Sequence, residues 1–359
     1  MTGLNLLTGF TFLYFFGHAK HMLKNIITIL ISVLLLALVY SAYEMLVPVQ
    51  SANKNNEIVI PRGATYRQVA DILWDEKLIR DKKVFLLLGR LTGADRKIRA
   101  GYYPIWSNMS PLDIFKVIRK GHIIEYEIRI LEGDSLLEIA DKFSKIGITA
   151  PDDFMKLSKD PEFLSSYDIE SSSMEGYLFP DTYMIPKGVG AEEAVGSMID
   201  KMREKFDEKI TARMAELGMS ENQVLTLASI IEKEAVVDSE RPLISAVYHN
   251  RLRKNMPLQS DPTAIYGIKS SKERITKKDL QVKTPYNTYL VKGLPPGPIA
   301  SPGLKSVTAA LYPADVTYLY FVSSDDRTHR FSSTIGEHEN AVRLYRERQQ
   351  VMKGATKEG

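Results

Sequence analysis

Two glutamates, Glu232 and Glu234, stand in an otherwise apolar stretch that predicts a helix over residues 222–237. Successive helical residues are turned by about 100°, so Glu232 shares a face with Leu225 and Ala228. A carboxyl group on an apolar face is desolvated, and desolvation raises its pKa. A raised pKa suits a general acid that works near neutral pH.

The same helix gives Glu234 a comparable position near Leu227 and Ile230, with Arg241 two turns further along the chain. Because the helix is apolar nearly all round, its spacing does not choose between the two glutamates. The alternative for either residue is a structural carboxylate, satisfied by a buried arginine or by backbone N–H groups. Periodicity by itself favours this structural alternative.

A second group of residues stands in loops rich in glycine and proline. Sugar rings present apolar faces and many hydroxyls, so a glycan site combines aromatic rings with amides and hydroxyls. Each such residue could also pack in a core, but their clustering in loops indicates a binding site. The predicted substrate-binding residues are Tyr177, Tyr183, Asn250, Gln259, Ser260, Asp261, Tyr266, Tyr286, Asn287, Thr288 and Tyr289.

Three further residues have a functional and a structural interpretation. Most glycosidases use two carboxylates, and Asp181 and Asp261 are the candidates for a second one. For both, hydrogen bonding within a loop or helix cap is the preferred interpretation. Arg251, beside Asn250 on the next predicted helix, has a structural ion pair as its alternative role.

Other chemistries find little support. The 359-residue chain has no cysteine, which excludes disulfides, thiolate catalysis and cysteine-based zinc sites. Its six histidines form no pair with the spacing of HExxH, and neither a GxSxG nor a Walker motif is present. We therefore expect no metal and no cofactor. The net charge of +3 gives no reason to expect a nucleic-acid partner.

The elements that position these residues begin with a repeated unit. Residues 58–71 (IVIPRGATYRQVAD) align with residues 128–141 (IRILEGDSLLEIAD). Each copy predicts a strand, a glycine turn and a helix that opens with a capping box, at Thr65 and at Ser135. The unit resembles the LysM-like module, whose family binds glycans containing N-acetylglucosamine. The alternative is a compact unit with a structural role only.

Downstream, the apolar periodicity predicts a mixed arrangement of helices and one clear strand. Helices are expected over residues 152–166, 191–217, 241–253 and 304–312, and a strand over residues 318–323.

Residues 26–43 (IITILISVLLLALVYSAY) form an uncharged apolar segment long enough to span a membrane. Lys20 and Lys24 precede it and Glu44 follows, so the positive-inside rule places the N-terminus in the cytoplasm. The rest of the chain would then lie on the periplasmic or extracytoplasmic side of the cell (inner) membrane. The alternative is a cleaved signal peptide.

Two flanking segments complete the N-terminal part. Residues 1–21 are an uncertain extension, because Met22 stands where a signal anchor usually starts, and we expect translation to begin there. Residues 49–56 predict a short polar linker without core contacts, so removal of residues 1–56 is expected to leave the fold intact.

Six strings over residues 58–340 carry a more specific resemblance. EGYLFPDTY, LASIIEKEA, SAVYHNRL, LQSDPTAIYG, TPYNTY and GLPPGPIASPG, in this order, resemble the YceG-like family of endolytic murein transglycosylases. In that family the first glutamate of the EKE string is catalytic, which implies Glu232 here. One departure is Ser301, where the family leads us to expect asparagine. This loop position bears on substrate contacts rather than on the reaction.

The resemblance also implies a reaction and partners. Glu232 would protonate the glycosidic oxygen between N-acetylmuramic acid and N-acetylglucosamine, and would then act as base on the muramic C6 hydroxyl. The product is a 1,6-anhydro end, and no water is consumed. The enzyme would cut nascent peptidoglycan strands as a terminase of strand elongation, together with peptidoglycan synthases (penicillin-binding proteins).

We therefore predict an α+β protein with a single transmembrane helix. The expected parts are a cytoplasmic start and signal anchor over residues 22–47, a LysM-like module over 48–125, a YceG-like catalytic domain over 126–345 and a polar tail over 346–359. The alternative functions are a non-catalytic glycan-binding scaffold of the cell-wall synthesis machinery and a hydrolytic muramidase.

Overall fold

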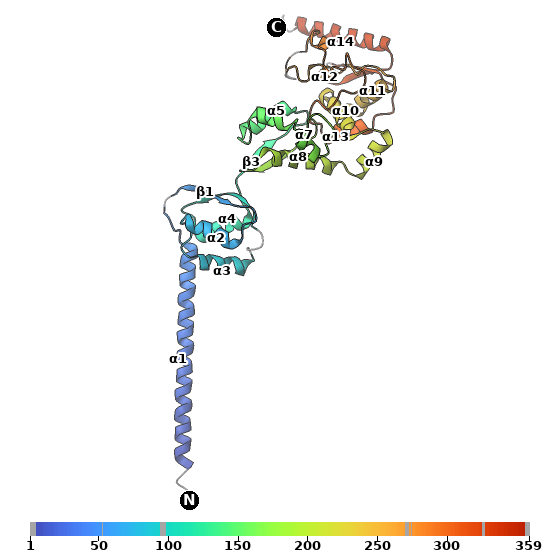
Figure 1. The fold of residues 1–359 in the computed structure, drawn as a ribbon. Coiled ribbons are helices and arrows are strands. Elements are labelled where there is room, and N and C mark those ends of the chain that lie inside the picture. Colours follow the sequence, from blue (N-terminus) through green and yellow to red (C-terminus); the bar gives the residue numbers. More distant parts are fainter. Residues whose placement is uncertain are drawn as a thin grey trace. The chain divides into compact units, whose positions relative to one another are not determined.

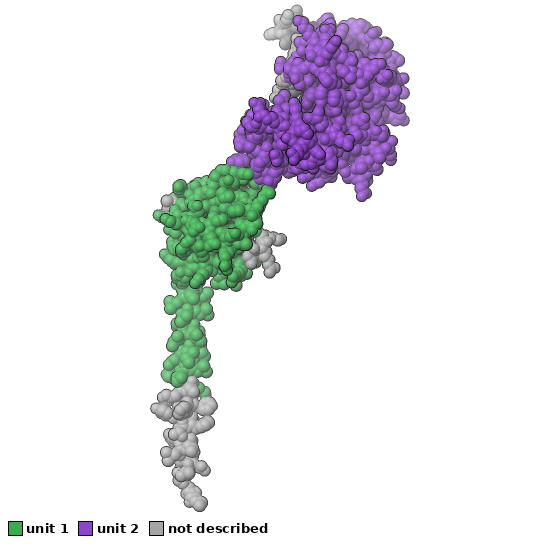
Figure 2. Space-filling view, viewed as in Figure 1, with its two compact units in different colours: residues 1–125, 186–188 green, residues 126–185, 189–359 purple. Residues whose placement is uncertain are grey.

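The structure is a computed structural model that describes residues 5–51, 53–93, 98–269, 273, 275–324 and 327–355, with side chains described from Lys20 to Gln350. The chain forms two compact units, which Figure 2 colours separately. Unit 1 comprises residues 1–125 and 186–188, and unit 2 comprises residues 126–185 and 189–359. Each unit has a hydrophobic core of its own.

Unit 1 begins with the long helix α1, Asn5–Leu46, which extends beyond the predicted apolar segment 26–43 at both ends (Figure 1). Its part Lys20–Leu46 is long and apolar enough to cross a membrane, with a mean hydropathy of 2.5 over its most apolar window. None of that window is buried inside the protein. The helix is therefore a candidate membrane anchor or signal sequence.

The predicted linker, residues 49–56, contacts the body of unit 1, so the expectation of a linker without such contacts is wrong. Nε2 of Gln50 donates to the Lys77 carbonyl at 3.2 Å, and the Lys54 N–H donates to the Ser107 hydroxyl at 3.1 Å. The first strand already begins at Asn55, inside the predicted linker. Removal of residues 1–56 would therefore cut into a sheet as well as release these contacts.

The body of unit 1 is a two-stranded antiparallel sheet packed with helices. In the sheet, Ile58 and Ile60 are buried whereas Val59 between them is exposed, the alternation of a sheet with one packed face. The elements are β1 (Asn55–Ile60), α2 (Tyr66–Asp75), α3 (Lys82–Thr92), β2 (Gly101–Trp106) and α4 (Pro111–Lys120).

Both predicted capping boxes are present. The Thr65 hydroxyl accepts from the Gln68 N–H in α2, and the Gln68 side chain accepts from the Thr65 N–H. Ser135 and Glu138 make the same reciprocal pair at the start of a helix in unit 2. These interactions span three residues, so they are encoded locally in the sequence.

Unit 2 is a mixed α+β domain built mainly of helices (Figure 1). Its elements before the central helix are β3 (Glu125–Arg129), α5 (Leu136–Lys145), α6 (Pro151–Leu157), α7 (Pro161–Ser166), β4 (Thr182–Pro186), α8 (Ala191–Lys205) and α9 (Glu208–Leu217). Those that follow are α10 (Glu221–Glu234), α11 (Arg241–Arg253), α12 (Asp261–Ile265), α13 (Leu304–Leu311), β5 (Tyr320–Ser323), β6 (His329–Ser332) and α14 (Ile335–Ala355), with single 3₁₀ turns at Asp238–Glu240 and Asp279–Gln281.

Two predicted helices are each divided in the structure. The segment 152–166 contains α6 and α7, because Pro161 lacks an N–H and starts a new helix. The segment 191–217 contains α8 and α9, because the Asp207 side chain accepts from the Ile210 N–H and caps α9. The predicted helix over 241–253 matches α11 at both ends.

Helix α10 is the central element of unit 2. Residues 224–231 are buried without interruption, and the helix contacts α11, α12 and α13. A helix that is apolar on every side is expected to lie within a core. It ends at Glu234 rather than at Val237, so Glu232, Lys233 and Glu234 occupy its last three positions.

Candidate active site

Glu232 lies in the last turn of α10, and its side chain is only 6% exposed. Its Oε1 is 3.0 Å from Nη1 of Arg241, the first residue of α11. Its Oε2 accepts a hydrogen bond of 2.9 Å from the N–H of Gly303, the N-cap of α13. The carboxylate is therefore held between a guanidinium and the positive end of a helix dipole.

Arg241 is itself buried and has further partners. Its Nε donates to Asp238 at 3.1 Å, and its Nη1 also donates to the Ser306 hydroxyl. The sequence analysis allowed for a Glu232 carboxyl satisfied by a buried arginine or by backbone N–H groups, and the structure shows both kinds of partner. Because α10 ends at Glu234, the chain turns back and brings Arg241 to Glu232, a contact that helical spacing cannot show.

Glu234 has different surroundings. Its Oε1 accepts hydrogen bonds from the Ser260 hydroxyl at 2.6 Å and from the Tyr248 hydroxyl at 3.2 Å. Burial raises the pKa of Glu234, and these two hydrogen bonds oppose that rise. The two glutamates of α10 therefore differ in their partners: Glu232 pairs with the guanidinium of Arg241, whereas Glu234 accepts from two hydroxyl groups.

Five predicted substrate-binding residues come together beside Glu234. The Ser260 N–H donates to Oγ1 of Thr288 at 3.0 Å, and the Gln259 N–H donates to the Thr288 carbonyl at 3.1 Å. The Tyr289 hydroxyl donates to Asp261 at 2.5 Å. Gln259 and Asp261 are exposed, so this pair of loops presents polar groups to solvent next to the end of α10.

Two predicted tyrosines lie in the core instead. Tyr177 is 2% exposed and Tyr183 is 8% exposed, and both belong to the core cluster of unit 2. The Tyr183 hydroxyl donates to the Phe179 carbonyl at 2.7 Å. Side chains with so little accessible surface have no face left for a sugar, so the structure gives them a packing role.

Two predicted amides are structural as well. Nδ2 of Asn250 donates to the carbonyls of Val316 and Tyr318, at 2.9 and 2.8 Å. Nδ2 of Asn287 donates to the carbonyls of Leu280 and Val282, at 3.1 and 2.8 Å. Both side chains are buried. They hold loops in place by satisfying buried carbonyl groups.

Arg251 and Asp181 also have structural partners. Nε of Arg251 donates to the Leu319 carbonyl at 2.6 Å, and Nη1 donates to the Leu258 carbonyl at 2.8 Å. Arg251 is therefore structural, through carbonyl groups rather than the expected ion pair. Asp181 pairs with Lys201, and the hydrogen bond from this lysine lowers the pKa of Asp181. The Thr182 N–H also donates to Oδ1 of Asp181 at 2.7 Å, which is the hydrogen bonding within the loop that the preferred interpretation of Asp181 expects.

The remaining predicted residues, Tyr266 and Tyr286, lead to a carboxyl that the sequence analysis did not single out. Their ring centres are 4.6 Å apart, and the Tyr266 hydroxyl donates to Oε2 of Glu175 at 2.8 Å. Glu175 is 2% exposed, and its two oxygens accept from the Leu136 N–H at 3.1 and 3.2 Å. Glu175 opens the string EGYLFPDTY, which is the only signal in the sequence that could have marked it.

Burial raises the pKa of Glu175 to about 7, although the Tyr266 hydroxyl and the Leu136 N–H favour the ionised form. Because the pKa is higher in the folded than in the unfolded chain, this group stabilises the fold at low pH. That contribution is lost as the pH rises from about 4.5 to about 7.

We therefore predict that Glu175→Gln flattens the pH dependence of stability. One pKa unit corresponds to about 1.36 kcal/mol. Between pH 5 and pH 8 the free energy of unfolding of the wild-type chain should therefore fall by roughly 3 kcal/mol, and that of the variant should not show this decrease. Urea unfolding of the detergent-solubilised chain at several pH values measures this. Glu216→Gln, which changes an exposed carboxyl, is the matched control. Parallel pH profiles for wild type and Glu175→Gln would contradict the prediction.

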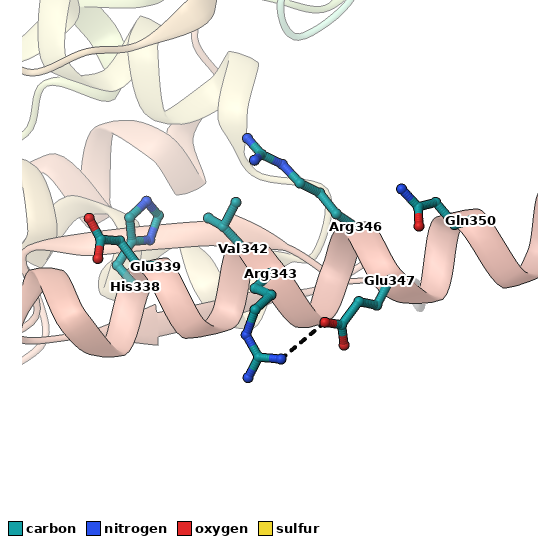
Figure 3. Close-up of a pocket in the computed structure, with 7 residues that line it drawn as sticks. All are labelled: His338, Glu339, Val342, Arg343, Arg346, Glu347 and Gln350. Atoms are coloured by element: carbon teal, nitrogen blue, oxygen red, sulfur yellow. Dashed lines mark hydrogen bonds and ion pairs between the residues drawn. The ribbon is translucent and has the colours of Figure 1, made fainter.

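A hollow at the surface of unit 2 lies apart from this site. Figure 3 shows that it runs along a single helix, α14, where Arg343 and Glu347 form an exposed ion pair of 3.0 Å. None of the predicted site residues lines it. Within the part of the chain that the structure describes, no three histidine, aspartate or glutamate side chains gather in a way that could hold a metal ion.

Known proteins are similar to this chain in sequence and in fold. Residues 58–344 match the YceG-like family. An endolytic murein transglycosylase of Bacillus subtilis is 34% identical over 318 residues, which cover 84% of this chain and 88% of that protein. One from Streptococcus pneumoniae is 28% identical over 315 residues, covering 78% of this chain and 56% of that protein.

Among solved structures, the crystal structure of a yceG-like protein from Listeria monocytogenes aligns with a TM-score of 0.56 and 34% identity. The alignment covers 81% of this chain and 100% of that one. The family match includes all of the loops and the helix that surround Glu232, Glu234 and Glu175. On this agreement of sequence and fold, the chain belongs to the YceG-like family.

Proposed function

We propose that this chain is an endolytic murein transglycosylase, a lyase that cuts the glycan strands of peptidoglycan. The observation that carries the proposal is the 34% identity, over 84% of the chain, to a relative that bears this name. The geometry of unit 2 supports it, because buried carboxyls at the end of α10 adjoin loops that present hydroxyl, amide and aromatic groups.

In the proposed reaction Glu232 gives its proton to the glycosidic oxygen between N-acetylmuramic acid and N-acetylglucosamine. The bond from that oxygen to the muramic C1 breaks, and the N-acetylglucosamine end leaves with a hydroxyl. The Glu232 carboxylate then takes the proton of the muramic C6 hydroxyl, whose oxygen bonds to C1 and closes the 1,6-anhydro ring. Glu232 regains its proton, and no water is consumed.

The contacts of Glu232 suit the intermediate stage of this reaction, between the two proton transfers. After the first proton transfer the side chain carries a negative charge in a site that excludes most water. Arg241 and the Gly303 N–H already lie at its two oxygens, so this charge is stabilised without rearrangement. The same two contacts hold the carboxyl in one orientation.

The reaction product tests the proposal. Purified glycan strands digested with the detergent-solubilised chain should yield 1,6-anhydro ends, identified by mass spectrometry. Reducing ends in their place would identify a hydrolytic muramidase. Intact strands, with retained binding, would identify a non-catalytic scaffold.

Unit 1 supports a proposal about where cleavage occurs. Its strand–helix–helix–strand order over residues 55–106 supports the resemblance to LysM-like modules, and thus glycan binding. With α1 in the cell (inner) membrane, the enzyme would meet strands as they emerge from the penicillin-binding synthases, because tethering raises the local concentration. Cleavage of nascent strands would make it a terminase of strand elongation.

The topology of this arrangement is testable. Lys20 and Lys24 precede the apolar span, so the N-terminus is expected in the cytoplasm and the chain beyond α1 outside it. Protease added to spheroplasts should digest the chain beyond α1 while an N-terminal tag stays protected. Detergent lysis, the control, should expose the tag as well. A C-terminal end that resists protease in intact spheroplasts would contradict this topology.

A further inference from the structure

A cavity of about 590 Å³ lies within unit 2, beside the end of α10. Small-molecule sites commonly fall within about 300–1,000 Å³, so it is large enough for a ligand. Its walls are the first turns of α5, the segment 262–269, and Lys233 with Ile299. Lys233 follows Glu232 directly in the chain, and the Ile299 N–H donates to Ser229 of α10 at 3.0 Å.

The walls of this cavity combine apolar surface with balanced charges. Apolar side chains from α5, α6 and α12 line it next to the Tyr266 ring. Its acidic residues are Glu138, Asp141 and Glu175, and its basic residues are Lys159, Lys233 and Lys269. Lys269 pairs with Asp279 at 2.5 Å, and Nζ of Lys233 donates to the Gly133 carbonyl at 3.1 Å.

This combination suits a neutral sugar that carries an acetamide. Such a sugar needs apolar surface for its ring face and its methyl group, and hydrogen-bonding groups for its hydroxyls and amide. A peptide with several carboxylates would need a surplus of positive charge, and the cavity has as many acidic as basic residues.

Glu175 joins two of the walls. It accepts from the N–H of Leu136, the first residue of α5, and from the hydroxyl of Tyr266, which follows α12. These partners are far apart in the chain, and Glu175 is the group that bonds both. Its carboxyl therefore sets the distance between α5 and the segment that carries Tyr266.

We propose that this cavity binds one N-acetylated sugar residue of the glycan, and that Glu175 is the positioning residue that fixes its walls. The choice of ligand rests on the proposed function. The site itself rests on the cavity beside Lys233 and on the two hydrogen bonds of Glu175.

Binding is best tested without turnover, in the full detergent-solubilised chain that carries Glu232→Gln. The probe is the tetramer of N-acetylglucosamine, and the readout is its protection of lysines from an amine-reactive label, measured by mass spectrometry. Lys159 and Lys233 should be protected, whereas the exposed Lys156 outside the cavity should not. This readout reports the cavity separately from any binding to unit 1.

Two matched substitutions then locate the site. Leu137 is 60% exposed and lines the cavity, so Leu137→Trp should fill it and raise the half-protecting tetramer concentration about tenfold or more. Ile335 is 55% exposed and lies on α14, so Ile335→Trp should change nothing. Unaltered protection in Leu137→Trp, or protection only by a peptide-bearing fragment, would overturn the proposal.

The role of Glu175 is tested by measuring how the protection of the lysines depends on pH, in the same Glu232→Gln chain. Ionisation of Glu175 changes the charge of the wall, so protection should vary across the region of pH 7, and Glu175→Gln should remove that variation. Glu221→Gln, which alters a partly buried carboxyl outside the cavity, should retain it. The other titratable groups of the cavity, Glu138, Asp141, Lys159, Lys233, Tyr266 and Lys269, are unchanged in both variants. Identical pH profiles with and without Glu175 would overturn the positioning role.

The outcomes also separate this proposal from the proposed reaction. A chain that cuts no glycan but shows the expected lysine protection would refute the reaction and support the sugar site. A chain that yields 1,6-anhydro ends while the tetramer protects neither lysine would support the reaction and refute the sugar site.

Discussion

Replacing Glu232 by glutamine is expected to abolish glycan cleavage while the fold is kept. Loss of a general acid–base group costs about 10²–10⁴ in rate, or roughly 3–5 kcal/mol in the reaction barrier. Glutamine has the same shape and can still accept from the Gly303 N–H, and Arg241 retains Asp238 and Ser306 as partners. The initial rate of anhydro-end formation measures the loss, and the thermal midpoint measures the fold.

Glu234→Gln is the matched control for this prediction. Glu234 lies two residues away on the same helix, and glutamine can still accept from Ser260 and Tyr248. We expect this variant to keep most of its activity. Full activity in Glu232→Gln, or a loss seen only in Glu234→Gln, would move the catalytic role to the desolvated carboxyl of Glu234.

Replacing Arg241 by alanine is expected to destabilise the protein strongly. The Arg241 and Glu232 side chains are 8% and 6% exposed, so the substitution leaves a buried carboxylate without its guanidinium. Removing one partner of a buried ion pair typically costs about 3–5 kcal/mol. Urea unfolding of the detergent-solubilised chain should show a decrease of this size in the free energy of unfolding.

Arg343→Ala provides the comparison for an exposed pair. Arg343 and Glu347 are 62% and 54% exposed and lie four residues apart on α14 (Figure 3), so their loss should cost only about 0.3–0.5 kcal/mol. A double-mutant cycle with Glu232→Ala and Arg241→Ala should give a coupling of about 0.5–3 kcal/mol. Additive effects of these two substitutions would show that the pair contributes no interaction of its own.

Much of the local structure could be predicted because it depends on residues close together in the sequence. The capping boxes at Thr65 and Ser135, the start of α11 at Arg241 and the apolar character of α10 follow from side chains within a few positions of one another. The errors in helix length have equally local causes, at Pro161 and Asp207. The membrane-spanning potential of α1 likewise follows from its length and composition.

The motif strings identified the family from the sequence, but they did not show what each residue contacts. A tyrosine or asparagine suits a sugar site and a packed core equally well, since both provide rings and polar groups. Burial separates the two roles, and it places Tyr177 and Asn287 in the interior while Tyr266 lines the cavity. Burial depends on the packing of the whole domain, which no local spacing encodes.

The surroundings of the three buried glutamates were decided only by the tertiary structure. Helical spacing did not distinguish Glu232 from Glu234 as the catalytic residue, and it gave no information about Glu175. The structure pairs Glu232 with Arg241 and Gly303, and it joins Glu234 to Ser260. Most of these partners come from distant parts of the chain, and even Arg241 reaches Glu232 only because α10 ends and the chain turns back. The surroundings of each carboxyl are therefore set by which segments pack against α10, whereas the sequence alone determined that acidic groups would stand on this apolar helix.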